Sequence, residues 1–512
     1  MANSTINRWP QWLVGIVLVS WGLRLLIAWL LPPGFDEAYY FLYTQHWDWS
    51  YFDHPVMVAL TTAVGPALTG YLSPLTLRLG ALGLYGLSTV LLFLTGRWLF
   101  DAAAARYAVA IAAISPLFIF SFGLLTAPDN GLILFWTAAG YVAAREFFPR
   151  GKSYRSTPKL ALLGLLLGLA CLSKYHGFLL GLSLVGFCLT SRPHRRALIS
   201  PWTCLSLVIF TATLLPLIVW NAQNGWISFG FHLSSRFEGD VALQARPLNI
   251  LVTWLVGIAY LFPPLGFALW WVVWQRLRQP SAQEQLVLWT GLPTALGFTL
   301  LGGVSQIYPA WPAPGLWSLS LLLGQAMSRW PNRQRWLRAS AGVIGLLLSV
   351  ALSHVALGTF QSAGRYTLLP AVSPQQDPTT TLIDVVQLRR ALASMPTATA
   401  LEAADVVVTS EFWLSGYVDM AISPLTEIPV MTLGEDPRGH ALWFSPADWV
   451  GKQGVFITIA DQDQLEIQQR YRPYFEKFEL LDTVQTFRGG AVTETFYLYE
   501  LGQITRAYVY PY

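Results

Sequence analysis

The segment 32–74 carries side chains that could do acid–base chemistry, and it lies between two long apolar runs. It contains two histidines and four carboxylates but no lysine or arginine, and the next basic residue is Arg78. The carboxylates are Asp36, Glu37, Asp48 and Asp53. A carboxylate beside a membrane is costly unless it is hydrated or used, and a well-placed carboxylate acts as a general base. We therefore expect a catalytic centre at Asp36 and Glu37, whereas a hydrated loop or helix cap is the better interpretation for Asp48.

A second acidic candidate, Asp129, stands in the motif Thr-Ala-Pro-Asp-Asn-Gly at 126–131. A Pro-Asp-Asn sequence is also an ordinary helix start, in which the carboxylate caps the first turn. Two acidic segments on one face of a membrane would favour a shared cleft. We therefore keep Asp129 as a catalytic candidate, with the helix cap as its alternative.

The motif Ser-Lys-Tyr-His-Gly at 173–177 places a lone lysine, Lys174, before Tyr175 and His176. Its ammonium group is a compact point charge that could bind a phosphate or pyrophosphate. The alternative is an interfacial lysine whose stem covers apolar surface while its charge reaches water. The Pro-rich segment 305–314 contains Tyr308. We keep Tyr308 as a candidate for substrate binding, and the alternative is that it belongs to an aromatic belt at the membrane interface.

Apolar helices must position these motifs. The chain has 512 residues, of which 54% are hydrophobic and only 12% are charged, against about 25% charged in ordinary soluble domains. Apolar runs near the length that crosses a bilayer, about 20 residues, recur to residue 358 or so. They predict a polytopic α-helical membrane protein with about eleven transmembrane helices. The predicted helices start near Gln11, Leu79, Ala104, Asn130, Leu160, Gly177, Pro201, Leu248, Gln285, Ala310 and Trp336.

The loop charges orient this chain, because cytoplasmic loops carry an excess of lysine and arginine. With a cytoplasmic N-terminus, the basic residues of the inside loops are Arg8, Arg97, Arg106, Arg145, Arg150, Lys152, Arg155, Lys159, Arg192, Arg195, Arg196, Arg276, Arg278, Arg329, Arg333, Arg335 and Arg338. The outside loops hold few, namely Lys174, Arg236 and Arg246. We therefore predict a multi-pass plasma (inner) membrane protein whose acidic segment, Asp129 and Lys174 face the extracytoplasmic side. Basic residues confined to short loops also argue against a nucleic-acid partner.

An odd number of spans places the tail, residues 359–512, outside the cytoplasm. Its strand-like segments are 405–410, 454–460 and 495–500, and its amphipathic helical segments are 383–394 and 462–471. We predict two domains, a transmembrane catalytic domain over 1–358 that includes the acidic loop 32–74, and an extracytoplasmic α/β domain over 359–512. The three cysteines have no disulfide or zinc spacing, and no inverted repeat of the secondary-transporter kind is visible.

Four motifs in this order resemble the bacterial GT-C glycosyltransferases, which are related to protein O-mannosyltransferases and to the aminoarabinose transferase of lipid A. They are Phe-Asp-Glu-Ala-Tyr-Tyr at 35–40, Tyr-Phe-Asp-His-Pro at 51–55, Thr-Ala-Pro-Asp at 126–129 and Leu-Ser-Lys-Tyr-His-Gly at 172–177. The resemblance covers roughly residues 10–330 and is weak over the tail. The combination is much more specific than any single motif.

The resemblance implies a GT-C fold and an inverting transfer of a sugar from a polyprenyl-phosphate-linked donor, outside the cytoplasm. Asp36 matches the residue that binds the acceptor and acts as general base. Glu37 matches its motif partner, and Asp129 matches the second acidic residue. These three residues are the catalytic set that the resemblance predicts.

Substrate-binding residues follow from the same motifs. Lys174 falls where the family places a basic residue near the donor phosphate, with Tyr175 and His176 beside it. Tyr308 falls loosely in the region of an aromatic residue near the lipid phosphate, and His54 belongs to the motif without a firm role. The chemistry agrees, because a single displacement needs a base for the acceptor and positive charge on the leaving phosphate.

Several alternatives stay open. A retaining route would need a second carboxylate as nucleophile. Some GT-C enzymes bind a divalent cation, and Asp36, Asp129 and His54 have suitable ligand atoms, although no cofactor is certain. A transporter or flippase of lipid-linked sugars would place charges inside spans, where Arg24 is the clearest case, and a non-catalytic scaffold is a third class. Sugar and acceptor (lipid, glycan or protein) are not specified.

Overall fold

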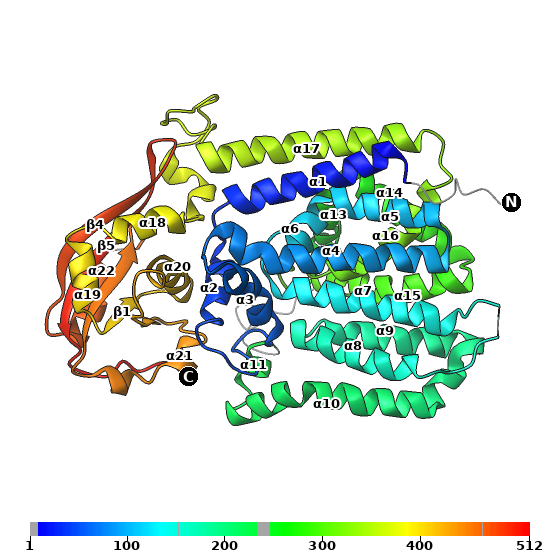
Figure 1. Ribbon diagram of the computed structural model, residues 1–512, viewed down its shortest axis with the longest axis horizontal. Coiled ribbons are helices and arrows are strands. Elements are labelled where there is room, and N and C mark those ends of the chain that lie inside the picture. Colours follow the sequence, from blue (N-terminus) through cyan, green and yellow to red (C-terminus); the bar gives the residue numbers. More distant parts are fainter. Residues whose placement is uncertain (1–8, 152, 233–245, 463, 512) are drawn as a thin grey trace. The chain divides into compact units, whose positions relative to one another are not determined.

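The computed structural model describes residues 9–151, 153–232, 246–462 and 464–511 (Figure 1). Arg8, Lys152 and Arg236, which the charge pattern used, lie outside the described residues. The chain divides into two compact units that we treat separately. The helical unit comprises Met1–Leu26, His54–Thr61 and Gly80–Leu347, and the mixed unit comprises Ile27–Asp53, Thr62–Leu79 and Leu348–Tyr512.

The helical unit is built from helices that run alongside one another (Figure 1). They are α1 (Gln11–Leu30), α4 (Pro74–Leu99), α5 (Ala102–Ile114), α6 (Pro116–Gly123), α7 (Pro128–Phe147), α8 (Lys159–Ser173), α9 (Gly177–Thr190), η2 (Arg192–Ile199), α10 (Pro201–Gln223), α11 (Ile227–Gly230), α13 (Pro247–Leu261), α14 (Pro263–Arg278), α15 (Ala282–Leu301), α16 (Ala313–Met327) and α17 (Arg333–Leu357). α1, α4 and α17 each continue into the mixed unit.

Four of the described helices, α1, α4, α10 and α17, are long and apolar enough to cross a membrane. Two bent pairs raise the number to six if each pair is one span: α5 and α6 meet at 79°, and α13 and α14 at 116°. The expected helices near Ala104 and Leu248 are therefore broken. Pro116 and Pro263 cause the breaks, because a proline inside a helix removes a hydrogen bond and clashes with the preceding turn. The count of eleven spans stays a prediction.

The mixed unit contains a five-stranded sheet in the order β2-β1-β3-β5-β4. Its strands are β1 (Val406–Thr409), β2 (Val430–Thr432), β3 (Gln453–Ile459), β4 (Glu479–Arg488) and β5 (Ala491–Gln503). β1 pairs in parallel with β2 and β3, while β5 pairs antiparallel with β3 and β4. The three strand-like segments of the sequence correspond to β1, β3 and β5. β2 and β4 were not expected.

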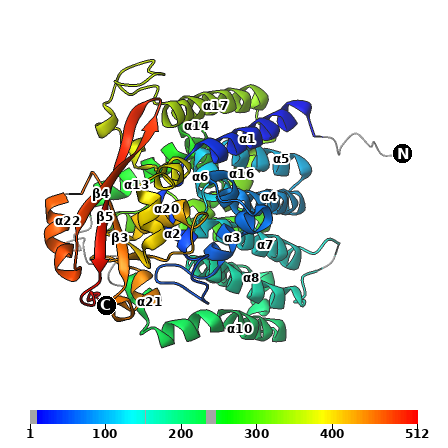
Figure 2. The same ribbon diagram turned by 60° about the vertical axis from the view of Figure 1, so that its left-hand side comes forward.

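Helices cover both faces of this sheet (Figure 2). The remaining elements of the mixed unit are α2 (Phe35–Leu42), α3 (Met57–Thr69, shared with the helical unit), η4 (Pro374–Gln376), η5 (Pro378–Thr381), α18 (Val385–Leu392), α19 (Thr397–Ala403), α20 (Phe412–Ile422), α21 (His440–Trp443), η6 (Pro446–Trp449), α22 (Gln464–Tyr471) and η7 (Arg472–Tyr474). One apolar core joins α2, α18 and α20 to the sheet, and a second core lies on the face of α22. Most of the acidic segment therefore packs as part of the sheet-containing unit, whereas its residues His54–Thr61 belong to the helical unit. The predicted domain boundary at 358/359 stays a prediction.

Candidate active site residues

Asp36 and Glu37 stand in the first turn of α2, where a negative charge is favoured by the helix dipole. The helix starts after Gly34, whose amide donates to Glu37 Oε2 at 3.0 Å. Asp36 is exposed, whereas Glu37 is only 2% exposed. Neighbouring residues on a helix point in different directions, so the two carboxylates of the motif have different surroundings.

Glu37 is held by a buried arginine, Arg78, from the first turns of α4. Arg78 Nε donates to Glu37 Oε1 at 2.9 Å and its Nη2 donates to Oε2 at 2.6 Å. The other guanidinium donors reach the carbonyl oxygens of Ala28, Leu31 and Pro32 at 2.7–3.1 Å. All five N–H donors of an arginine are thereby used, so Arg78 ties α2 to the end of α1.

Asp53 has a partly buried arginine partner. Arg438 Nη1 donates to Asp53 Oδ2 at 2.9 Å, and Tyr43 donates its hydroxyl to Asp53 Oδ1. Burial raises the pKa of Tyr43 well above its usual range, and the Asp53 carboxylate adds to the effect. The acidic segment contains no lysine or arginine itself, and Glu37 and Asp53 find their basic partners elsewhere in the chain. Their partners lie 41 and 385 residues away along the chain.

In the helical unit, Asp129 and Lys174 form a buried ion pair. Lys174 Nζ lies 2.8 Å from Asp129 Oδ2 and 3.0 Å from Oδ1, with exposed side-chain fractions of 10% for Lys174 and 7% for Asp129. The side chain of Asn130, not of Asp129, accepts from the amide of Ala127 at the start of α7. Asp129 is thus left to pair with Lys174, which follows the last residue of α8. Lys174 is buried in this pair and does not reach outward as an interfacial lysine.

Aromatic rings connect the remaining candidates of the helical unit. The ring of His54 lies 5.9 Å from that of His232, which lies 5.0 Å from the ring of Tyr175. In a second group of rings, the ring of His176 lies 4.7 Å from that of Phe298 and 6.1 Å from that of Trp311. Trp311 in turn lies 5.8 Å from Tyr308, which is 53% exposed. Ring contacts therefore link His54 with Tyr175 through His232, and His176 with Tyr308 through Trp311, in the unit that also holds the Asp129–Lys174 pair.

Metal binding has no geometric support in the described part of the chain, where no group of three or more His, Cys, Asp or Glu side chains could hold an ion. The ligand set of Asp36, Asp129 and His54 stays a prediction.

The charge inside α1 has a structural explanation. Arg24 is fully buried, and its guanidinium donates to the carbonyl of Ala113 at 3.0 Å and to the Tyr85 hydroxyl at 2.9 Å. Ala113 belongs to the last turn of α5, whose carbonyls carry the negative end of the helix dipole. Arg24 therefore caps the break between α5 and α6. A transporter would need a charge that serves a substrate, and this one is used by the fold.

An apolar groove of about 430 Å³ lies between α13 and α15. It is lined by Pro247, Ile250, Leu251, Trp254, Leu296, Thr299 and Leu300. Phe298, on the same turn of α15, contacts the ring of His176. The groove therefore lies on the helix that also supports the motif around Lys174.

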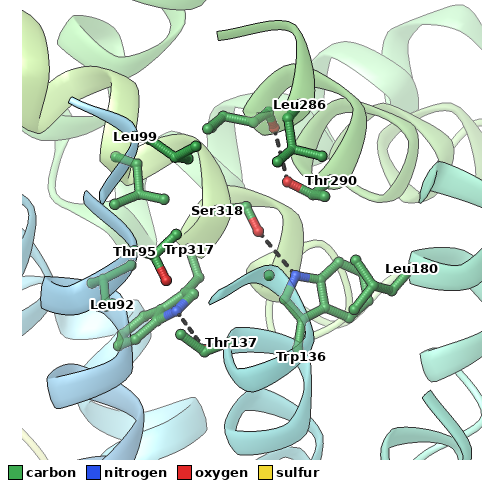
Figure 3. Close-up of a pocket in the computed structure, with 13 residues that line it drawn as sticks. Leu92, Thr95, Leu99, Trp136, Thr137, Leu180, Leu286, Thr290, Trp317 and Ser318 are labelled. Carbon is green, nitrogen blue, oxygen red and sulfur yellow. Dashed lines mark hydrogen bonds between the residues drawn. The ribbon is translucent and has the colours of Figure 1, made fainter. Parts of the chain in front are cut away.

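A smaller cavity of about 30 Å³ lies among α4, α7, α9, α15 and α16 (Figure 3). Two crossed hydrogen bonds border it: Trp136 Nε1 donates to Ser318 Oγ at 2.9 Å, and Trp317 Nε1 donates to Thr137 Oγ1 at 3.0 Å. Because such a volume suits one or two water molecules, the cavity is too small for a sugar. It belongs to the helix packing.

Arg78 and Arg438 are the important residues that sequence reasoning missed. Nothing in the local pattern marks either as a partner of the acidic segment, since each pair joins segments that meet only in the folded chain. The bends at Pro116 and Pro263 carried a partial signal, because proline favours a break in a helix, whereas α10 and α15 continue through Pro216 and Pro293.

Comparison with known proteins gives a consistent result. Residues 53–220 match the family model for dolichyl-phosphate-mannose-protein mannosyltransferases. The lipid A galacturonosyltransferase RgtD of Rhizobium johnstonii is 23% identical over 323 residues. That match covers 62% of this chain and 65% of the relative, which is less than two thirds of its length.

Two solved structures share the fold. ArnT from Cupriavidus metallidurans in the apo state has a TM-score of 0.64 at 14% identity, covering 95% of this chain and 97% of that chain. The same protein bound to undecaprenyl phosphate has a TM-score of 0.57 at 14% identity and the same coverage. The chain thus has the mostly helical GT-C membrane fold. The motif resemblance to GT-C glycosyltransferases of the protein mannosyltransferase and ArnT type is confirmed.

Proposed function

We propose that this chain is a glycosyltransferase that moves a sugar from a polyprenyl-phosphate-linked donor to an acceptor on the extracytoplasmic side of the membrane. The observation that carries the proposal is the buried pair of Lys174 and Asp129, together with an apolar groove on a helix of the same unit, α15, whose Phe298 contacts the ring of His176. A prenyl chain needs an apolar channel, and its phosphate needs a cation. Both requirements are met within the helical unit.

Lys174 has the properties of a cation for the donor phosphate. Its only side-chain partner among the described residues is Asp129. A lysine has three donors, so the ammonium group can take a phosphate oxygen while it keeps the carboxylate. Positive charge on the leaving phosphate stabilises the charge that develops in the transition state.

Asp36 is the proposed general base. It is exposed at the start of α2, so an acceptor hydroxyl could reach it. Its neighbour Glu37 is occupied by Arg78 through two hydrogen bonds, which disfavours Glu37 as a nucleophile. Because a retaining route needs a nucleophilic carboxylate about 5 Å from the acid, this occupation supports an inverting single displacement. Glu37 then acts by holding α2 in place.

The acceptor is proposed to be a glycolipid. The relative named above as a lipid A galacturonosyltransferase favours this class over glycan or protein. The undecaprenyl phosphate in the structure of ArnT favours a polyprenyl phosphate carrier for the donor. We also propose that the protein lies in the inner membrane with about eleven spans. Its N-terminus is then cytoplasmic, and its residues 359–512 form an extracytoplasmic domain.

The experiment compares Asp36→Asn with Asp48→Asn, which changes an exposed carboxylate in the same segment. Membranes containing each protein are incubated with undecaprenyl-phosphate sugars and lipid acceptors, and the lipid extract is analysed by mass spectrometry. We expect Asp36→Asn to lower transfer by at least about 100-fold, the scale of lost acid–base catalysis, with Asp48→Asn near wild type. Full transfer by Asp36→Asn would overturn the assignment of the base. Movement of the donor lipid without any sugar transfer would indicate a flippase.

A further inference from the structure

The C-terminal residues of the mixed unit hold the acidic segment from two sides. At one end, α20 crosses α2 so closely that a methyl group on Gly416 would lie 2.4 Å from the backbone carbonyl of Ala38. Only glycine permits this approach. The next residue, Tyr417, donates its hydroxyl to the carbonyl of Pro33 at 2.7 Å. The start of α2, where Asp36 lies, is therefore packed against the C-terminal half of the mixed unit.

At the other end, Arg438 reaches the segment through Asp53. The pair is 2.9 Å long, and the exposed side-chain fractions are 22% for Arg438 and 4% for Asp53. The guanidinium also lies 4.0 Å from the ring centre of Phe412 on α20. Burial by itself lowers the pKa of Arg438, but the Asp53 carboxylate, Tyr39 and Asp436 together offset this, so the pKa is raised. The arginine is held between α20 and the acidic segment.

Asp53 transmits this contact to α2. Its second oxygen accepts from the hydroxyl of Tyr43, the residue that ends α2. Tyr43 also stacks on Tyr51, with ring centres 3.8 Å apart. Next to Arg438, the amide of Gly439 donates to the hydroxyl of Tyr39 on α2 at 3.1 Å. A continuous path of hydrogen bonds thus runs from Arg438 to the helix that carries Asp36.

The backbone at Arg438 supports a specific role. Its φ of 45° lies in the left-handed region, which costs energy for residues that have a side chain. Strain of this kind persists where the surroundings impose it, and it gathers at functional sites. Here it aims the guanidinium at Asp53.

We propose that Arg438 is a positioning residue that fixes α2, through Asp53 and Tyr43, in the geometry that Asp36 needs to act as base. The C-terminal part of the mixed unit is then a component of the catalytic apparatus. This inference rests on the proposed function for its effect on sugar transfer. Its effect on the order of α2 does not depend on that function.

The test uses the full-length protein in detergent or nanodiscs and the variants Arg438→Gln, Arg438→Lys and Tyr43→Phe. Tyr43→Phe removes only the hydroxyl that binds Asp53 and keeps the stacked ring, so it tests the path if Arg438→Gln does not fold. Arg470→Gln is the matched control, because Arg470 forms an exposed pair with Glu435 in the same unit. Hydrogen exchange of residues 35–53 and the rate of sugar transfer are measured for each variant.

We expect Arg438→Gln to lower kcat by on the order of 100-fold, the effect of a small misplacement of a catalytic group, with little change in KM for the donor. Exchange in residues 35–53 should become faster, while residues 453–503 keep their protection. Tyr43→Phe should show smaller changes of kcat and of exchange in the same directions. Arg438→Lys should recover part of the kcat and part of the exchange protection. Arg470→Gln should match wild type.

Unchanged exchange of residues 35–53 in both Arg438→Gln and Tyr43→Phe would overturn the inference. Faster exchange with normal sugar transfer would show that the contact orders the segment without serving catalysis, which also overturns it. If Asp36→Asn transfers sugar normally, the proposed base fails. Faster exchange in Arg438→Gln would then still support the ordering of α2, so the two failures can be told apart.

Discussion

Two buried pairs of a carboxylate and a cation, one in each unit, have the same chemistry and different surroundings. Glu37 and Asp129 both lie in the first turn of a helix, and each faces a basic residue. Arg78 is fully buried and uses every donor on Glu37 and three carbonyls. Lys174 is slightly exposed and binds Asp129 alone among the described residues.

The difference lies in the donors that remain. A guanidinium with five satisfied donors has nothing to offer a ligand, so the Glu37 pair serves the fold. An ammonium group with one partner keeps donors for an anion, so the Asp129 pair can serve a substrate. The number of satisfied donors therefore separates a structural ion pair from a candidate site better than burial or distance.

The largest effect is expected for Arg78→Gln. It leaves Glu37 buried without a cation and three carbonyls without donors, and breaking a buried pair costs about 3–5 kcal/mol. Thermal unfolding of the purified variant should occur at a much lower temperature than in wild type, or the variant should not fold. Arg78→Lys should recover little, because a lysine cannot reproduce the five-donor geometry. If Arg78→Gln unfolds at the wild-type temperature, the Glu37–Arg78 pair is not the structural ion pair that the comparison with Asp129–Lys174 requires.

Asp419 sharpens the comparison, because it is a buried carboxylate that forms no ion pair with the described residues. Its Oδ2 has no hydrogen-bond partner among the described residues, and burial raises its pKa from 3.8 to about 7. The unfolded chain ionises this group above about pH 4, whereas the folded chain keeps it protonated until about pH 7. Folding stability is therefore lost as pH rises through this window and is constant above it.

The expected size of this loss is up to about 4 kcal/mol. Asp419→Asn should remove it, making the variant more stable than wild type at pH 8 and similar to it near pH 4. Unfolding curves of both proteins at a series of pH values measure the difference. If the unfolding free energies of wild type and Asp419→Asn change in parallel with pH, Asp419 is ionised in the folded chain.

Lys174→Gln should lower sugar transfer by about 100-fold, equivalent to about 2.7 kcal/mol of transition-state stabilisation, because the leaving phosphate loses its cation. Its cost in stability should be smaller than that of Arg78→Gln, since only one ion pair is lost and no backbone carbonyl loses its donor. Lys159→Gln, at the other end of α8, is the control and should transfer sugar normally. Equal losses of stability in Lys174→Gln and Arg78→Gln would contradict the distinction drawn between the two pairs.

The smallest effect is expected for Arg470→Gln. Its pair with Glu435 is 2.8 Å long, with exposed side-chain fractions of 34% and 83%. Exposed pairs contribute about 0–1 kcal/mol, so the unfolding midpoint should barely move. A loss above about 2 kcal/mol would show that exposure is a poor guide to ion-pair strength in this unit.

Periodicity and local motifs predicted much of this molecule. Apolar runs located the helices because a span must bury its backbone hydrogen bonds within one segment. The strand-like segments at 405–410, 454–460 and 495–500 located β1, β3 and β5. Lys174 and Asp129 were expected on one side of the membrane, and the structure joins them in an ion pair.

Long-range pairing could not be predicted. Asp53 and Arg438 are 385 residues apart, and no local pattern relates them. The strand β4 was not predicted, although its second half alternates between exposed and buried residues. The roles of Asp36 and Glu37 diverged for the same reason, since the motif does not show which carboxylate Arg78 would occupy.

The crossed bonds between α7 and α16 have an evolutionary consequence. Trp136 and Asp129 are seven residues apart, so they lie within about 20° of each other around the axis of α7. Rotation of α7 by one residue, about 100°, would break both Trp136–Ser318 and Trp317–Thr137 and would turn Asp129 away from Lys174. Positions 136, 137, 317 and 318 should therefore change together among relatives that keep an acidic residue at 129.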